Sequence, residues 1–185
     1  MGLTKSLLVL TVLLLFSACS QLTLEEKNSQ QKAIDDMADY TIEALSKEDA
    51  AIMPELEQAK GYMVVNWKVT KVPVVGAGGG NGVVVDQRSG KRVYITVKRF
   101  DIGGGWGARS YKNLVIINDD ALMDEAKDGV IKFEAGAEVA AGTKGVDGGS
   151  GALNPKIQTH MLLDGGGSAT ATVRVLRSSL NSDLN

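Results

Sequence analysis

Hydrophobic and polar residues follow two different patterns along the chain, and the change from one to the other falls near residue 60. Before it, apolar residues recur at the three- and four-residue spacing of one helix face, which predicts an amphipathic helix. These residues are Ala33, Ile34, Met37, Ala38, Ile42 and Leu45. A second helix is predicted next, because Ser46 and Asp49 are similar to a capping box and Pro54 would bend or begin the helix.

From Gly61 onward, β-branched and aromatic residues form short runs separated by glycines or polar turns, which predicts β-strands. The predicted strands cover residues 62–65, 68–75, 83–86, 92–99, 114–118, 131–141, 159–163 and 169–176. Residues 88–91 predict a hairpin turn, residues 119–127 predict a short helix that ends at Gly129, and the polar tail from Ser178 is expected to fray. The whole pattern predicts an α+β fold. An N-terminal helical arm precedes a glycine-rich antiparallel sheet, curled into a sandwich or small barrel, with one short inserted helix.

The start of the chain has the pattern of a signal peptide. Lys5 precedes ten uninterrupted apolar residues, 7–16, which is about half the ~20 needed to span a bilayer. Residues 16–19 (FSAC) are similar to a bacterial lipobox, whose cysteine is lipid-modified after cleavage, although Leu is usual at its first position. No second cysteine exists to pair with Cys19, so a lipid anchor is predicted there. The alternative is ordinary secretion, with Cys19 merely near the cleavage site. Ser20, where an Asp would favour the inner membrane, favours the outer membrane and a periplasmic location.

Charge is distributed unevenly along the chain. Residues 19–59 carry three basic and ten acidic side chains, residues 60–115 carry ten basic and two acidic, and residues 116–185 carry six basic and ten acidic. The net charge of -2 therefore conceals a strongly basic middle segment. A near-neutral total argues against a nucleic-acid-binding protein. A single His and a single Cys exclude most metal sites built from those ligands, so neither a metal nor a cofactor is expected. The expected organisation is a signal peptide (1–18), a helical arm (19–44), a β domain (45–178) and a polar tail (179–185).

The chain has 22 glycines, and three of the places where they gather are similar to enzyme motifs. Residues 76–82 lack the Gly-Lys-Ser/Thr ending of a phosphate-binding loop. Residues 103–108 match G-x-G-x-x-A, but a strand follows where a nucleotide-binding fold needs a helix. Residues 149–151 are similar to a nucleophile elbow with His160 as the only base, but their flanks read as loop. No catalytic activity is expected, and the glycines are expected to mark bends, bulges and close approaches in a curved sheet.

The basic segment predicts a cationic surface. Strand alternation over residues 92–98 places Val93, Ile95 and Val97 on one face, and it places Arg92, Tyr94, Thr96 and Lys98 on the other. Such a face suits anionic lipid head groups, because its charges contact phosphates and its rings settle at the interface. The alternative is an ordinary solvated face. The candidate head-group ligands are Lys68, Arg88, Lys91, Arg92, Tyr94, Lys98, Arg99 and Arg109.

Several blocks of the sequence resemble the SYLF domain family in order and spacing, over about residues 45–176. They are residues 59–65, 76–85, 103–108 and 114–126, then Phe133, Gly136, Ala137 and residues 139–142. The chain departs from the family at Val65-Asn66, where Phe-Pro is common, near Arg109, where a Gln is usual, and at Asn113, where an acid is usual. The resemblance implies phospholipid or phosphoinositide binding without catalysis. Some eukaryotic members also bind actin, which an exported bacterial lipoprotein is not expected to meet.

Two functions from different classes follow. The favoured one is an envelope lipoprotein that is anchored through Cys19 and binds anionic phospholipid through its basic strands. The alternative is a structural or interaction lipoprotein whose β domain holds a protein partner or the cell wall. Salt should weaken the first interaction, because it screens attraction to a charged surface.

Overall fold

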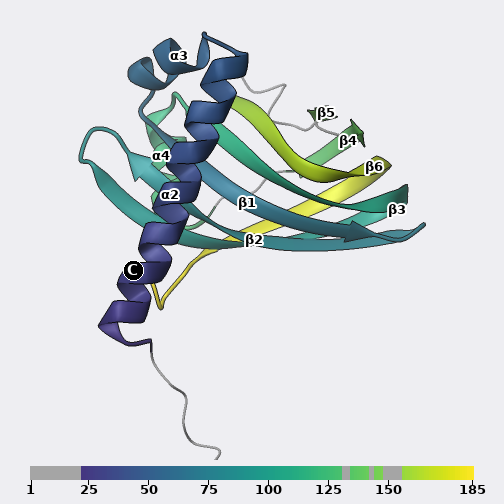
Figure 1. Cartoon of the computed structure of the whole chain (residues 1–185), viewed down its shortest axis with the longest axis horizontal. Helices are drawn as coiled ribbons and strands as arrows, with labels where there is room; N and C mark the ends of the chain where they lie inside the picture. Colours follow the sequence, from purple (N-terminus) through teal and green to yellow (C-terminus); the bar gives the residue numbers. More distant parts are fainter. Residues whose placement is uncertain (1–21, 131–133, 142–143, 148–155) are drawn as a thin grey trace, which may run out of the picture.

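The computed structural model describes residues 22–130, 134–141, 144–147 and 156–185. An N-terminal helix lies across one face of an antiparallel sheet that curls into a half-barrel, and a short helix is inserted between two of the strands (Figure 1). The expected α+β architecture is therefore confirmed. Cys19 and the Gly-Ser-Gly run at 149–151 lie outside the described residues.

Three helices are present in the described part of the chain. Helix α2 (Leu24–Glu48) begins well before the predicted stretch, because Thr23 caps it and Glu26 completes a capping box. Helix α3 (Ile52–Gln58) begins after Ala51, which makes no side-chain cap. The predicted cap at Ser46 and Asp49 is therefore wrong: residue 46 lies within α2, and Asp49 is its C-cap. Helix α4 (Asp120–Lys127) is capped by Asp119 and followed by Gly129 with φ 71°, as predicted.

The strands form a set of nested hairpins. They are β1 (Gly61–Lys71), β2 (Val75–Asp86), β3 (Lys91–Ile117), β4 (Glu134–Ala141), β5 (Lys144–Asp147) and β6 (Ile157–Leu180). The first half of β3 pairs with β2 and the second half pairs with β1, both antiparallel, so β3 folds round the end of the β1–β2 hairpin. Strand β6 pairs along the length of β3 and folds round it in turn. Strand β4 pairs with β6, and β5 pairs with β4.

The glycine blocks lie inside strands instead of between them, which corrects the expected strand boundaries. Residues 76–82 belong to β2 and residues 103–107 to β3, so the predicted strands 92–99 and 114–118 are parts of one long strand. The glycines permit close approach of neighbouring backbones in the curled sheet. At Gly80, an added Cβ would lie 1.7 Å from the carbonyl oxygen of Asn66 on β1.

Each face of the sheet has its own hydrophobic core. The inner, concave face is filled by alternate strand residues such as Val65, Trp67 and Ile95, and Met123 of α4 closes it. On the outer face, Leu45 of α2 and Leu56 of α3 belong to a second cluster that also contains strand residues. Helix α2 therefore covers one part of the outer face and leaves the remainder without a helix (Figure 1).

The C-terminal tail is docked, so the expectation that it frays is wrong. Leu184 is 1% exposed and belongs to the outer cluster beneath α2. The Asn185 side chain donates to the Tyr94 carbonyl at 2.7 Å and accepts from the Tyr94 N–H at 2.9 Å. Gln31 of α2 donates to the Leu184 carbonyl at 2.7 Å. The terminus thus lies beside α2, where it extends the cover over β3 (Figure 1).

Candidate functional site

Three cations form a row across the outer face of the sheet, beyond the part that α2 covers. Lys68 of β1 pairs with Gly79 of β2, which pairs with Lys98 of β3, which pairs with Arg177 of β6. All three cationic side chains are exposed, and no ion pair in the described part of the chain involves any of them. We call Lys68, Lys98 and Arg177 the cationic row. Two of its members, Lys68 and Lys98, are among the candidates predicted from the sequence.

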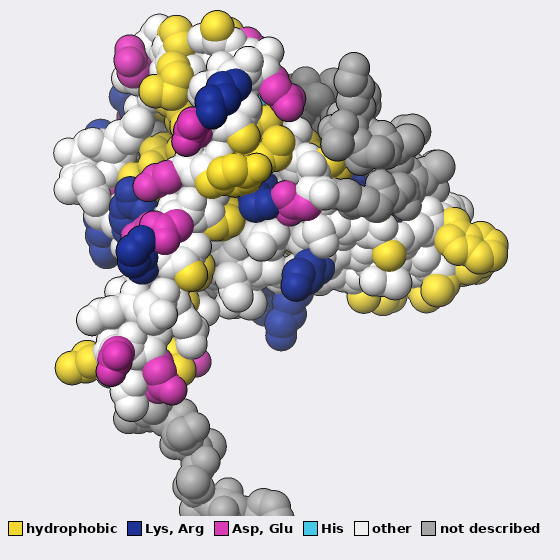
Figure 2. Space-filling model, viewed as in Figure 1, with side chains coloured by type: hydrophobic (Ala, Val, Ile, Leu, Met, Phe, Trp, Pro, Cys, Tyr) yellow, Lys and Arg dark blue, Asp and Glu magenta, His cyan; other side chains and the backbone are white. Residues whose placement is uncertain are grey.

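Next to the cationic row, the sheet ends in exposed hydrophobic side chains. They lie on the β1–β2 turn, the start of β2 and the part of β3 that folds round them, where Val75 pairs with Ile102 and Gly103 donates to the Val74 carbonyl at 2.9 Å. Figure 2 shows hydrophobic side chains gathered at this far end of the sheet, to the right of the view. We call these residues the apolar end: Val72, Val74, Val75, Phe100, Ile102 and Trp106.

Two predicted candidates, Arg92 and Tyr94, contact α2: Tyr94 is buried beneath it, and Arg92 stays partly exposed but is paired with its Asp35. The guanidinium of Arg92 donates to Asp35 Oδ1 at 2.7 Å, and the Tyr94 hydroxyl donates to Asp35 Oδ2 at 3.0 Å. Tyr94 is buried, and burial together with the hydrogen bond to Asp35 raises its pKa to about 12. The acidic arm therefore covers this part of the basic segment, and Tyr94 has no access to a lipid head group.

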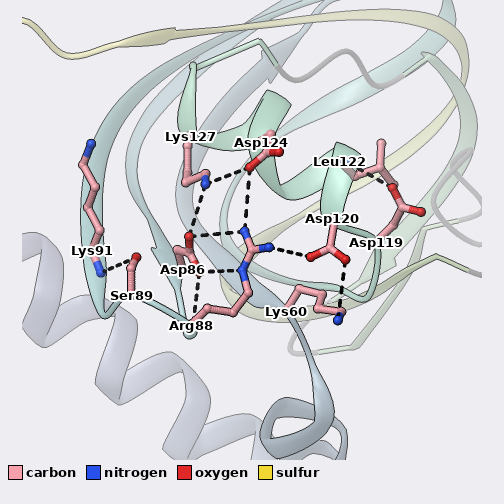
Figure 3. Close-up of polar contacts among 10 residues, drawn as sticks. All are labelled: Lys60, Asp86, Arg88, Ser89, Lys91, Asp119, Asp120, Leu122, Asp124 and Lys127. Atoms are coloured by element: carbon pink, nitrogen blue, oxygen red, sulfur yellow. Dashed lines mark hydrogen bonds and ion pairs between the residues drawn. The ribbon is translucent and has the colours of Figure 1, made fainter.

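Arg88 belongs to a network at the opposite end of the sheet, between the β2–β3 turn and α4 (Figure 3). It contacts Asp86 at 3.2 Å and Asp120 at 2.6 Å, and Lys127 contacts Asp86 at 3.2 Å. Hydrogen bonds from Arg88 and Lys127 hold the pKa of the buried Asp86 carboxyl well below its usual range, although burial opposes this. Lys91 is exposed on the same turn. This network fixes the turn against α4 and lies far along the strands from the cationic row.

Arg99 and Arg109, the remaining candidates, are buried on the inner face, so the expectation that they line an exposed basic surface is wrong. Arg99 is 3% exposed, is paired with Asp101 at 2.6 Å and donates to the Tyr111 hydroxyl at 2.7 Å. Arg109 is 5% exposed and lies 4.6 Å from the centre of the Tyr111 ring. A signal for this exists in the sequence, because Arg99 shares strand parity with Val97 and therefore faces the core side.

Sequence reasoning missed Arg177 and the whole apolar end. Arg177 joins the cationic row only through the pairing of β6 with β3, and that register has no local signal in the sequence. The apolar end has a weak signal, since Phe100 and Ile102 continue the alternation of Lys98 on the same face. The signal is hidden because the glycine block at residues 103–107 predicts a break in the strand.

Neither His160 nor the acidic side chains form a second candidate site among the described residues. The lone histidine, His160, lies 3.2 Å from Glu55 of α3, which is a contact between the sheet and a covering helix. Over the described residues, no group of three or more His, Cys, Asp or Glu side chains is arranged to hold a metal ion. None of the described helices is long and apolar enough to cross a membrane.

The chain matches no protein-family model, and no curated protein matches it significantly. The SYLF resemblance thus stays a prediction.

Proposed function

We propose that the protein is an envelope lipoprotein, anchored through Cys19, that binds anionic phospholipid at the cationic row. The observation that carries this proposal is the row itself: three exposed cations at one cross-strand level of β1, β3 and β6, none of which forms an ion pair with an acidic side chain among the described residues. The other basic candidates are paired, buried or remote from it. The SYLF resemblance supports the same class of ligand and adds no particular head group.

The geometry of the row suits phosphates at a membrane surface. Neighbouring strands lie about 4.8 Å apart, so a row that crosses from β1 to β6 extends over roughly 14 Å. Gly79 stands between Lys68 and Lys98 and carries no side chain, so a phosphate can approach the backbone between the two ammonium groups. A flat surface that carries several phosphates therefore matches the row better than a single small anion does.

The test is co-sedimentation of the protein with vesicles of phosphatidylglycerol and phosphatidylcholine, compared with phosphatidylcholine alone. Both hydrophobic clusters and all the described elements lie within residues 22–185, so a chain that begins at Ser20 keeps them and lacks the anchor. We expect binding only to the anionic vesicles, and we expect it to fall as salt is added. Replacing Lys68 and Lys98 together by Gln should weaken it about thirtyfold, at about 1 kcal/mol for each lysine near an anionic surface.

Lys91→Gln is the matched control, because it removes one exposed charge of the same kind at the opposite end of the sheet. Its binding should be close to that of the wild type. Lys68→Gln alone removes one charge from the row, and equal losses in the Lys91→Gln and Lys68→Gln variants would mean that only total charge matters and would overturn the assignment to the cationic row. If the wild type does not bind anionic vesicles at low salt, the proposed function is wrong. In that case the interaction-protein alternative becomes the better hypothesis.

A further inference from the structure

The polarity of the sheet reverses toward the apolar end. In the body of the sheet the inner face is apolar, and Trp67, Val97 and Tyr111 occupy one cross-strand level of it. Two residues further along the strands, the inner face carries Arg99 and Arg109 on either side of Val69, and two residues beyond these it carries Lys71 and Asp101, all of them buried. The outer-face residues that alternate with Arg99 and Asp101 along β3 are Phe100 and Ile102, both exposed. An antiparallel sheet with one solvated face has its apolar residues on the core side, so this arrangement is inverted.

The exposed apolar side chains gather at one end of the sheet. Backbone pairing joins the start of β2 to β3 at Val75 and Ile102, and the β1–β2 turn is held by the Val72 N–H, which donates to the Val75 carbonyl at 3.0 Å. Trp106 is 73% exposed, Val74 64% and Ile102 56%. Six exposed large apolar side chains at one end of a sheet differ from apolar residues scattered singly over a surface, and such gatherings are typical of interaction sites.

We propose that the apolar end inserts into the interface of a lipid bilayer while the cationic row contacts the phosphates. This inference rests on the proposed lipid binding and adds how deep the protein sits and which residues enter the lipid. Lys98 precedes Phe100 by two residues on the same face, and Ile102 follows by two more. At about 3.3 Å per residue, the row lies roughly 7 Å behind Phe100 and roughly 13 Å behind Ile102.

The spacing of roughly 7 Å between the row and Phe100 falls within the depth of a membrane interface, and Ile102 reaches a few ångströms deeper. Amphipathic elements bury their apolar face about 5–10 Å into the boundary between head groups and acyl chains. With the apolar end at this depth, Lys68, Lys98 and Arg177 lie at the level of the phosphates. Trp106 is a tryptophan, a residue type that is enriched at this boundary in membrane proteins. Lipid is therefore favoured over a protein partner, because an apolar end backed by cations that have no acidic partner among the described residues complements a surface that is anionic outside and apolar beneath.

An ion pair and a hydrogen bond of Arg99 on the inner face hold the apolar end in place before it meets lipid. Asp101 accepts from the Arg99 Nε at 2.8 Å and from its terminal nitrogen at 2.6 Å, and Arg99 also donates to Tyr111 at 2.7 Å. These contacts tie the outgoing and returning halves of β3 together beneath Phe100. Insertion then requires no refolding of the sheet, and the ordering cost of binding is small.

Trp106 provides a native reporter of insertion. The other tryptophan, Trp67, is 5% exposed in the inner core, so the emission of wild type minus Trp106→Phe isolates Trp106 without disturbing a buried residue. On anionic vesicles we expect this difference spectrum to shift to shorter wavelength. We also expect quenching by nitroxides placed near the carbonyl end of the acyl chains to exceed quenching by nitroxides near the chain ends.

Co-sedimentation in the same samples separates the two proposals. Protein that is bound while its Trp106 emission stays unshifted and unquenched would overturn insertion and leave lipid binding intact. Protein that does not bind at all would overturn both. As a second readout, Ile102→Ser should reduce the binding that survives at high salt about tenfold. Leu24→Ser, which changes an 80% exposed leucine on α2 in the same way, should leave that binding unchanged. Equal losses in the two variants would also overturn insertion.

Discussion

The carboxylate of Asp35 lies 2.7 Å from the guanidinium of Arg92, and this contact joins the acidic helix to the basic strand. The second oxygen of the same carboxylate accepts from the Tyr94 hydroxyl at 3.0 Å. The opposite charges of the two segments are therefore partly neutralised within the molecule. The cationic row lies past the end of this contact, and its three side chains form no ion pair within the part of the chain that the structure describes.

Asp35→Ala should lower the free energy of unfolding by about 1–3 kcal/mol, because it leaves the Arg92 charge and the Tyr94 hydroxyl without their partner under α2. Urea unfolding followed by circular dichroism measures the change. Asp36→Ala is the matched control, since Asp36 pairs with Lys32 on the exposed side of α2, and its loss should cost about 0.3–0.5 kcal/mol. Equal costs would show that α2 is not held at Asp35.

Acid should destabilise the protein through Asp86. Its pKa in the folded state is held below the value of about 3.9 that applies to the unfolded chain, by Arg88 first and also by Lys127. The stabilisation is therefore fully present above about pH 4 and is lost as the pH falls below that value. Thermal melts between neutral and strongly acidic pH should show a decline in the wild type that Asp86→Asn lacks. A variant with the same acid slope as the wild type would contradict this role.

Most elements of the fold could be predicted from the sequence, because their signals are local. The spacing of Ala38 and Leu45 gives one helix face, and Asp119 with Gly129 marks both ends of α4. The lengths of β3 and β6 could not be predicted, because each continues through a glycine block that reads locally as a break. Only the pairing of those blocks with neighbouring strands keeps them extended.

Only part of the candidate site could be predicted from the sequence, because the rest depends on the register in which the strands pair. Lys68 and Lys98 are each visible in the alternation of their own strands, but their common row depends on pairing across Gly79. Arg177 enters from β6, which is far away in the sequence. Arg99 has the charge of a surface residue and the parity of a core residue, and parity decides where it lies because the ion pair with Asp101 compensates its burial.

Close packing of β1 against β2 should make Gly80 intolerant of any side chain. Gly80→Ala would place its Cβ 1.7 Å from the Asn66 carbonyl oxygen, so the strands would have to separate, at a cost of about 3 kcal/mol or more. Gly104→Ala is the control, because no atom lies within 4 Å of its added Cβ. Urea midpoints compare the two variants. A Gly80 variant as stable as the Gly104 variant would mean that the sheet is not curled as described.

The docked C-terminus should contribute to stability although its sequence is polar. Leu184→Ala removes a side chain that is 1% exposed in the outer cluster, so we expect a loss of about 2–5 kcal/mol. Leu180→Ala, at a leucine that is 46% exposed, should cost well under half as much. Thermal unfolding of both variants gives the comparison. Because Asn185 holds the strand edge at Tyr94, hydrogen exchange of the Tyr94 amide should also quicken in the Leu184 variant. A tail that frays in solution would leave both the stability and that exchange rate unchanged.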